Sequence, residues 1–189
     1  MTPHPPAHPL ELKVPPLLVA FATAGMMWWL AELLPSLVMT IPWRGGFVVT
    51  VCGIGILCVL AGAYEFRRVK TTINPTKPTT TSTIVTAGIY HRSRNPMYVG
   101  MLMVLVGWAI ALAHPLSLLF LPLFVTYINR FQIIPEERVL AGRFGTEYER
   151  YRESVRRWLR YHPRRHTKSA LHLSCFRGKV APTLTLPNP

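Results

Sequence analysis

Two short stretches carry the side chains best suited to chemistry. The first, RSRNPMYVG, runs from Arg92 to Gly100 and joins two arginines to an Asn-Pro pair where a long apolar run begins. Asn95 and Pro96 are favoured just before and at the first position of a helix, so they predict a helix start whose amide groups, with Arg94, attract carboxylate or phosphate. Gly100 would let a ligand or a neighbouring backbone come close. The alternative is an ordinary capped membrane helix with arginines that reach to water.

The second stretch places two adjacent carboxylates, Glu136 and Glu137, directly after Pro135, where another apolar run ends. Negative charge at the end of a lipid-facing helix is costly unless it has a cationic partner. The pair could bind a metal, hold a cationic ligand or pair with Arg94, or it could form salt bridges along the following helix, for example with Arg138. The chain has no aspartate and no histidine cluster beside the pair, so we predict no metal site.

The composition places these stretches in a membrane protein. Half of the residues are hydrophobic, only 15% are charged, and the apolar positions come in runs. Runs of about 18 to 20 residues give roughly 27 to 30 Å of helix, enough to cross the hydrocarbon layer. A soluble bundle would need polar faces, which these runs lack. We therefore predict an all-α integral membrane protein with about four transmembrane helices, at residues 16–34, 47–64, 96–113 and 115–134.

The pattern outside the spans divides the rest of the chain. Residues 1–15 form a polar, proline-rich leader that does not resemble a signal peptide. Residues 135–160 carry a stripe at helical spacing, which predicts a C-terminal amphipathic helix at the membrane surface with its aromatic residues toward lipid. Residues 161–189 are basic and contain no acidic residue, so we expect a disordered tail. The stripe consists of Glu137, Leu140, Phe144, Tyr148, Tyr151, Val155 and Trp158.

The net charge of +13 is distributed by topology. Lysine and arginine gather in the loop at 67–95 and after Pro135, whereas the other two loops carry only Arg44. By the positive-inside rule the basic loop, both termini and the site are cytoplasmic in a multi-pass protein. Basic flanks on anionic membrane lipids explain the charge better than a nucleic-acid partner, which we do not predict.

A short turn should bring the two chemical stretches together. His114 and Pro115 interrupt the apolar run between the third and fourth spans and leave room only for a tight connection. These spans should therefore form an antiparallel pair, so that Asn95 and Glu136 emerge side by side. The predicted site is composite, with Arg94 and a helix start on one side and two carboxylates on the other.

The ordered motifs between residues 84 and 160 resemble those of a known family. They are NPMYVG followed by VGWAI, a His-Pro turn, an apolar helix, PEER and FGTEYERY. In this order they are similar to the membrane methyltransferases that include phosphatidylethanolamine N-methyltransferase and isoprenylcysteine carboxyl methyltransferase. The resemblance implies S-adenosylmethionine as the cofactor and a lipid, a lipidated molecule or a small apolar molecule as the acceptor.

The resemblance also implies roles for individual residues. It would place the cofactor's methionine carboxylate on the helix start, its ammonium on a glutamate and its sulfonium near an aromatic ring. We expect the two glutamates and the arginine of the motif to act in catalysis. The family's cofactor motif and glutamate pair correspond here to Arg94, Asn95, Pro96, Tyr98, Gly100, Glu136 and Glu137, and Tyr90 fits the lead-in to the motif.

Two glycines add a weaker correspondence. Gly53 and Gly55 match a glycine pair that phospholipid N-methyltransferases use with the same cofactor. The alternative is that these glycines permit close packing of two membrane helices.

Two departures bear on the acceptor. Many prenylcysteine enzymes have histidine where this chain has Asn95, and arginine where it has Gln132. A carboxylate acceptor would favour a nearby cation, so the second departure weakens the prenylcysteine assignment. An amine acceptor must lose a proton, for which Glu136, Glu137 or His91 is a candidate, whereas a carboxylate acceptor needs no base.

A non-catalytic membrane protein, such as a small transporter subunit or scaffold, is the competing interpretation. Transport favours ionisable groups near the middle of the bilayer. Only Glu32 approaches a predicted span, near its outer end, so we favour the enzyme.

Overall fold

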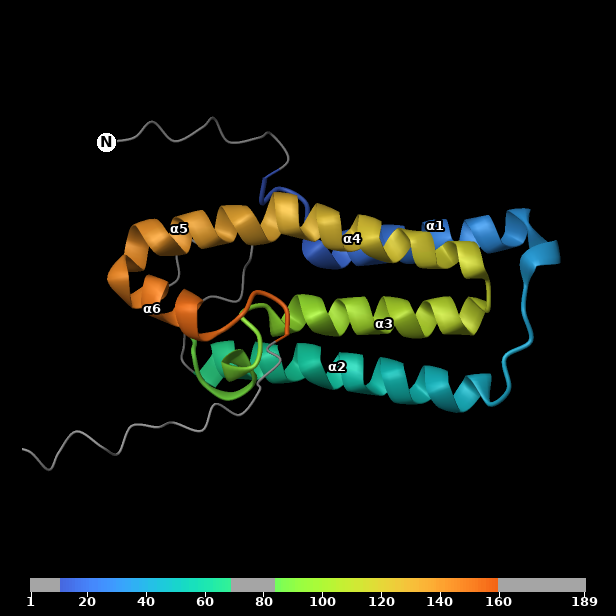
Figure 1. The fold of residues 1–189 in the computed structure, drawn as a ribbon, viewed down its shortest axis with the longest axis horizontal. Helices are drawn as coiled ribbons and strands as arrows, with labels where there is room; N and C mark the ends of the chain where they lie inside the picture. The colour runs from blue at the N-terminus through green and yellow to red at the C-terminus, as the bar shows by residue number, and fades with distance from the viewer. Residues whose placement is uncertain (1–10, 69–83, 160–189) are drawn as a thin grey trace, which may run out of the picture.

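The computed structural model describes residues 11–68 and 84–159, and within these ranges it contains helices and no strands (Figure 1). The predicted all-α architecture is confirmed. Most of the predicted leader, the middle of the 67–95 loop and the predicted tail lie outside the described residues. The main helices are α1 (Pro16–Leu33), α2 (Arg44–Arg68), α3 (Pro96–Leu112), α4 (Phe120–Ile128), α5 (Ile134–Phe144) and α6 (Thr146–Ser154).

Three stretches of the described chain are long and apolar enough to cross a membrane: α1, α2 and the helical run Pro115–Phe144. This run joins the 3₁₀ turn η4 (Pro115–Leu119), α4, the π-helical turn η5 (Asn129–Ile133) and α5. The apolar helix α3 has 17 residues, about 25 Å of helix, and is shorter than these three. A membrane protein is confirmed, and a fourth span stays a prediction.

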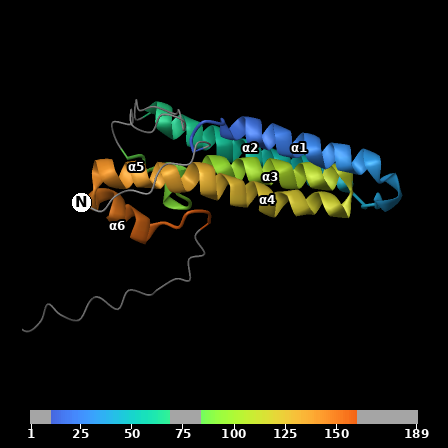
Figure 2. The same cartoon turned by 90° about the horizontal axis from the view of Figure 1, so that it is seen from above.

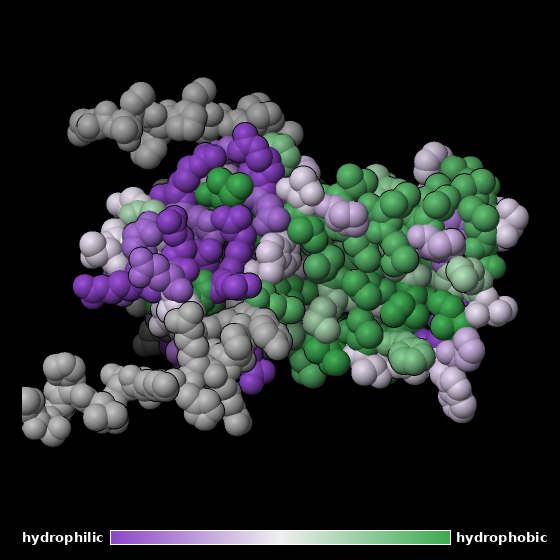
Figure 3. All heavy atoms as spheres, in the orientation of Figure 1, coloured by the Kyte–Doolittle hydropathy of each residue, from purple (hydrophilic) through white to green (hydrophobic). Residues whose placement is uncertain are grey.

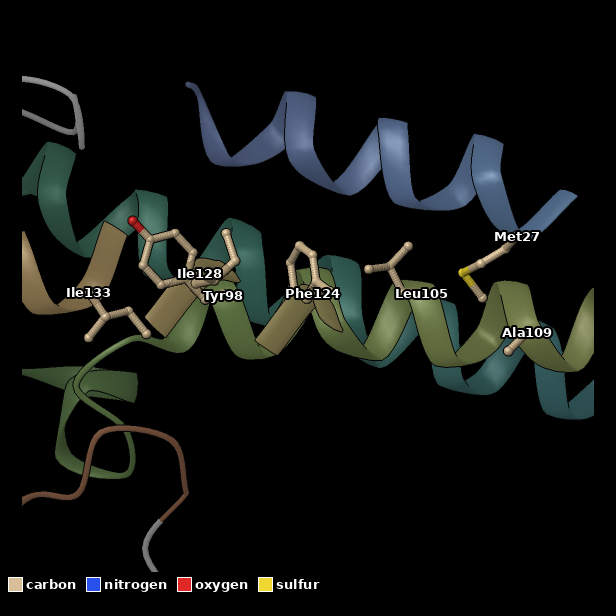
Figure 4. Close-up of a cluster of buried hydrophobic side chains, with 7 residues drawn as sticks. All are labelled: Met27, Tyr98, Leu105, Ala109, Phe124, Ile128 and Ile133. Carbon is tan, nitrogen blue, oxygen red and sulfur yellow. The ribbon is translucent and has the colours of Figure 1, made fainter. Parts of the chain in front are cut away.

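Helix α3 is the centre of the bundle, because it contacts α1, α2 and α4 (Figure 2). Its buried residues join those of α1 and α4 in one apolar cluster that runs along the bundle (Figure 4). Most apolar side chains of α1 and α2 point outward, as expected of helices that face lipid. The cluster consists of Met27, Tyr98, Leu105, Ala109, Phe124, Ile128 and Ile133.

Glycines let α2 and α3 approach closely. A Cβ atom on Gly100 would lie 2.5 Å from the carbonyl oxygen of Gly55, and one on Gly62 would lie 2.7 Å from Cγ of Met97. Small residues at a helix contact bring two backbones together, which is the usual way for helices to pack in lipid. The packing alternative predicted for Gly55 is therefore what the structure shows at this position.

The predicted hairpin is confirmed. Ala113 ends α3 in the left-handed conformation, with φ of 50°, and Pro115 begins η4 directly afterwards. The amide of Met39 donates to the carbonyl of Ala113 at 2.8 Å, and the ring of His114 lies 3.2 Å from the carbonyl of Leu34. The turn between α3 and α4 is thus fastened to the connection between α1 and α2, and α3 and α4 run antiparallel (Figure 1).

The fourth span was predicted to end just before Pro135. The helix instead continues through Pro135 to Phe144. Proline has no N–H and its ring crowds the carbonyl four residues earlier, which here belongs to Phe131. The π-helical turn η5 absorbs this crowding just before the proline. The amide of Leu12 donates to the Phe131 carbonyl at 3.0 Å in place of the missing N–H.

The predicted amphipathic helix at 135–160 is in fact two helices. Gly145 separates α5 from α6, with φ of 50°, a conformation that favours glycine. The aromatic residues that were predicted to face lipid pack against the protein instead. Tyr148 is only 2% exposed, and the indole of Trp158 donates to the side chain of Asn129 at 3.1 Å.

We expect the glycine contact between α2 and α3 to be sensitive to a single methyl group. Gly100→Ala should lower the free energy of unfolding by about 1–3 kcal/mol, because the added atom overlaps the Gly55 carbonyl. Gly53→Ala is the matched control, since its Cβ would have nothing within 4 Å. Thermal unfolding in detergent measures both, and equal effects would contradict this account of the packing.

Candidate active site

Most hydrophilic residues of the described chain gather at one end of the bundle (Figure 3). In the same view the rest of the bundle presents mostly apolar side chains. This end holds α5, α6, the last turns of α2 and the segment from residue 84 to the start of α3 (Figure 1). The predicted site residues on α3 and α5 meet here.

Glu137 is the centre of an ion cluster. Arg94 lies 3.2 Å from its Oε1 atom, and Arg157 donates from Nε at 3.1 Å and from Nη2 at 2.6 Å. The bidentate geometry of Arg157 makes this a strong and directional pair. The predicted partnership between Glu137 and Arg94 is present, whereas the alternative of local salt bridges along the helix is not what the described contacts show.

Glu136 points to a different partner. The hydroxyl of Tyr98 donates to both carboxylate oxygens, at 3.2 and 3.3 Å. Tyr98 is buried in α3 as part of the apolar cluster. The two glutamates therefore have separate roles: one neutralises arginines, and the other faces the start of α3.

The segment after α6 covers the start of α3. The amide of Arg94 donates to the carbonyl of Arg156 at 3.0 Å, and the side-chain amide of Asn95 donates to the carbonyl of Arg157 at 3.0 Å. Asn95 stands at the N-cap position, but its side chain makes no capping bond. The amides of Tyr98 and Val99 both donate to the carbonyl of Asn95. The helix start therefore offers a ligand fewer free amides than predicted.

Tyrosines line the same region. Arg94 donates to the hydroxyl of Tyr148 at 3.4 Å, and the hydroxyl of Tyr151 donates to the carbonyl of Tyr90 at 2.9 Å. Burial raises the pKa of Tyr148 to about 12, and the charge of Glu137 adds to this while Arg94 opposes it. These phenols stay protonated at neutral pH and act as neutral hydrogen-bonding groups.

An N-terminal strap, residues 11–15, supports the acidic side of the site. The Glu11 carboxylate lies 3.2 Å from Arg138 and 3.7 Å from Arg130. Gln132 donates to the carbonyl of Val14, and its own side-chain oxygen is buried without a hydrogen-bond partner among the described residues. The strap thus contacts the π-helical turn that precedes Glu136 and the helix α5 that follows it.

The structure does not bring every predicted residue to this cluster. Gly100 and Gly55 touch each other between α3 and α2, and Gly53 has open space beside it. The two glycines of α2 lie roughly 15 to 18 Å of helix before Glu65, which is at the charged end. Pro96 and Tyr90 are buried beside the cluster, over Gly62 of α2.

Several residues of the site were missed from the sequence. They include Arg157, which lies in a segment rich in arginines, and Ser93, whose hydroxyl accepts from the amide of Asn95 at 3.1 Å. Glu65 lies one residue beyond the predicted end of the second span. Glu65 follows a glycine by one turn, on the face of α2 that packs on α3. This spacing is the signal that could have indicated Glu65 as a residue of the site.

A family sequence description of phospholipid methyltransferases matches residues 43–147, which cover more than half of the chain. The chain belongs to the phospholipid methyltransferase family. Membership indicates a membrane methyltransferase, and the matched region contains α3, both glutamates and the hairpin that joins them. The resemblance in the sequence is confirmed at the level of the family.

The chain is also similar to an uncharacterized protein of Haemophilus influenzae. The two are 44% identical over 63 residues, which make up 33% of this chain and the whole of that protein. No solved structure matches this chain.

We expect the bond between Tyr98 and Glu136 to stabilise the charged end. Tyr98→Phe leaves the carboxylate without its phenol partner, which should cost about 1–3 kcal/mol of the free energy of unfolding. Tyr64→Phe on α2 is the control, because Tyr64 is 63% exposed. Denaturant unfolding in detergent compares the two, and an unchanged stability in Tyr98→Phe would show that the bond contributes nothing.

Proposed function

We propose that this protein is an integral membrane methyltransferase that transfers a methyl group from S-adenosylmethionine to a lipid, a lipidated molecule or a small apolar acceptor. The observation that carries the proposal is the meeting of an arginine–glutamate cluster with the Tyr98–Glu136 pair at one end of the bundle. Apart from Arg157, the residues of both lie within the region that matches the phospholipid methyltransferase family.

The residues present fit the amino-acid part of such a donor. The Nε atom of Arg94 is buried and has no hydrogen-bond partner among the described residues, so it retains a donor for a carboxylate. The Glu136 carboxylate, held by a single phenol, keeps acceptor capacity for an ammonium group. The rings of Tyr90 and Tyr98 would lie near a sulfonium.

The chain's contribution to the reaction is alignment. S-adenosylmethionine supplies an activated methyl group when bound, so no covalent nucleophile is needed from the protein. Arg94 and Glu136 would orient the donor, the segment after α6 would exclude water from the start of α3, and Glu137 would hold Arg94 in place. Asn95 and Pro96 would shape the entrance, since the former ties that segment to α3.

The acceptor side of the proposal rests on the apolar surroundings. A hollow of about 410 Å³ between α1 and α4 has an almost wholly apolar lining that includes Val14, Phe124 and Tyr127. Val14 also binds Gln132, one turn before Glu136. An acceptor with an apolar chain would reach the site from the membrane, while the donor would come from the cytoplasm. This arrangement takes α3 as a fourth span and places the site and both termini on the cytoplasmic side.

Donor binding is the first test. Titration of the purified protein with S-adenosylmethionine should show saturable binding, and Arg94→Met and Glu136→Gln should each weaken it about 10- to 100-fold, the effect of losing a hydrogen bond to a charged group. Arg92→Met is the control, because Arg92 is exposed in the same segment. No saturable binding by the unmodified protein would favour the non-catalytic scaffold, and unchanged affinity in both variants would place the donor elsewhere.

Methyl transfer is the second test. The protein is incubated with methyl-labelled donor and native membrane extract, and the label is followed into lipid, protein and water-soluble fractions. We expect the label in the lipid or lipidated fraction, with at least about a tenfold lower rate for Glu136→Gln because the donor is no longer oriented. Label confined to water-soluble products would contradict a membrane-resident acceptor.

A further inference from the structure

A third glutamate at the charged end, Glu65, has no part in the proposed function. Glu65 lies on α2 and is only 9% exposed. Its Oε2 atom is buried without a hydrogen-bond partner, and no salt bridge reaches it within residues 11–68 and 84–159. An isolated buried carboxylate is costly, and nothing in the helix packing requires one here.

The chain makes room for this carboxylate. Gly88 folds over it with φ of 59°, and a Cβ atom on Gly88 would collide with the Glu65 carboxylate. Tyr90 lies next to it: its ring meets Phe66 edge-on at 5.5 Å, and its hydroxyl is 3.5 Å from where a Cβ atom of Gly62 would be, one turn before Glu65. Gly88 and the phenol of Tyr90 thus form the walls around the Glu65 carboxylate.

Glu65 faces the same phenol as Glu136. Burial raises the pKa of Tyr90 above its ordinary value, and electrostatic interactions with Tyr151, Glu136 and Glu65 raise it further. The two carboxylates, one on α2 and one on α5, thus both act electrostatically on Tyr90. Glu136 is already bound to Tyr98, whereas the Oε2 atom of Glu65 has no hydrogen-bond partner in the part of the chain that the structure describes.

We infer that Glu65 is the acceptor-side carboxylate of the site, which binds the cationic nitrogen of an amine acceptor and takes its proton. The inference rests on the proposed function. An unpaired buried carboxylate beside a neutral phenol complements a group that brings positive charge and N–H donors, and it repels a carboxylate acceptor. A metal ion is a poorer occupant, because the described residues contain no group of three or more metal-binding side chains.

The step balances. Glu65 accepts one proton from the ammonium form of the acceptor and leaves a neutral amine with a free electron pair. That pair forms the new N–C bond to the methyl group as the S–C bond of the sulfonium donor breaks and its electrons stay on sulfur. The methylated nitrogen carries the positive charge away, and Glu65 returns its proton to water. Tyr90 and Gly88 hold the carboxylate in position.

The test uses the full chain in vesicles of phosphatidylglycerol with and without phosphatidylethanolamine, a primary-amine lipid, and methyl-labelled S-adenosylmethionine. We expect the amine lipid to be labelled and Glu65→Gln to lower kcat/KM for it at least about tenfold, as expected for a lost charge-assisted hydrogen bond. The Kd for the donor should stay within about twofold. The thermal midpoint should be unchanged or higher, because an unpaired buried charge is removed.

Controls separate the outcomes. Glu147→Gln on the exposed face of α6 should match the unmodified protein. Glu65→Asp keeps the charge and retracts it by one methylene, so it should show the same loss of kcat/KM even if the glutamine variant does not fold. Unchanged kcat/KM in both Glu65 variants, or a donor Kd that rises in parallel, would overturn the inference. Donor binding without labelling of the amine lipid would overturn it and leave the proposed function standing, whereas no donor binding would overturn both.

Discussion

The neutralisation of Glu137 by two arginines is the interaction on which the charged end depends. Arg94 precedes α3, Glu137 lies on α5 and Arg157 follows α6, so one cluster joins three distant parts of the chain. Each of these charges would be costly at the edge of a membrane without the others. The same contacts place Tyr98 opposite Glu136 and the segment after α6 over the start of α3. Folding this end and building the candidate site are therefore one process.

Pro135 sets a second constraint, because the helix must pass through it to deliver the glutamates. The π-helical turn absorbs the proline, and the N-terminal strap takes up a hydrogen bond that the proline cannot make. Glu11 then pairs with Arg130 within that turn and with Arg138 after it. π-turns inside α-helices often occur at functional sites, since they redirect the side chains that follow. Here the π-helical turn η5 sets the directions in which Glu136 and Glu137 point, so that each side chain reaches a different partner.

The glycines of α2 and α3 have a packing role that reaches the site indirectly. Close contact between Gly55 and Gly100 sets the distance between the two helices along their length. At the charged end the same closeness puts Gly62, Tyr90 and Glu65 beside the first turn of α3. Gly55 thus helps to hold two walls of the site together, and its role with a cofactor stays a prediction. This follows from packing in lipid, where small residues give helices their contact.

The sequence by itself determined the helical membrane class, the hairpin at His114 and Pro115, and the meeting of Arg94 with the glutamate pair, because hydropathy, loop length and charge act locally or through one short turn. Only the tertiary structure decided the rest. Whether a helix continues through Pro135 depends on an N-terminal segment far away in sequence, and whether the aromatic residues of α6 face lipid or protein depends on the turn at Gly145. The pairing of Glu137 with Arg157, and the lack of a partner for Oε2 of Glu65 among the described residues, depend on segments that no periodicity connects.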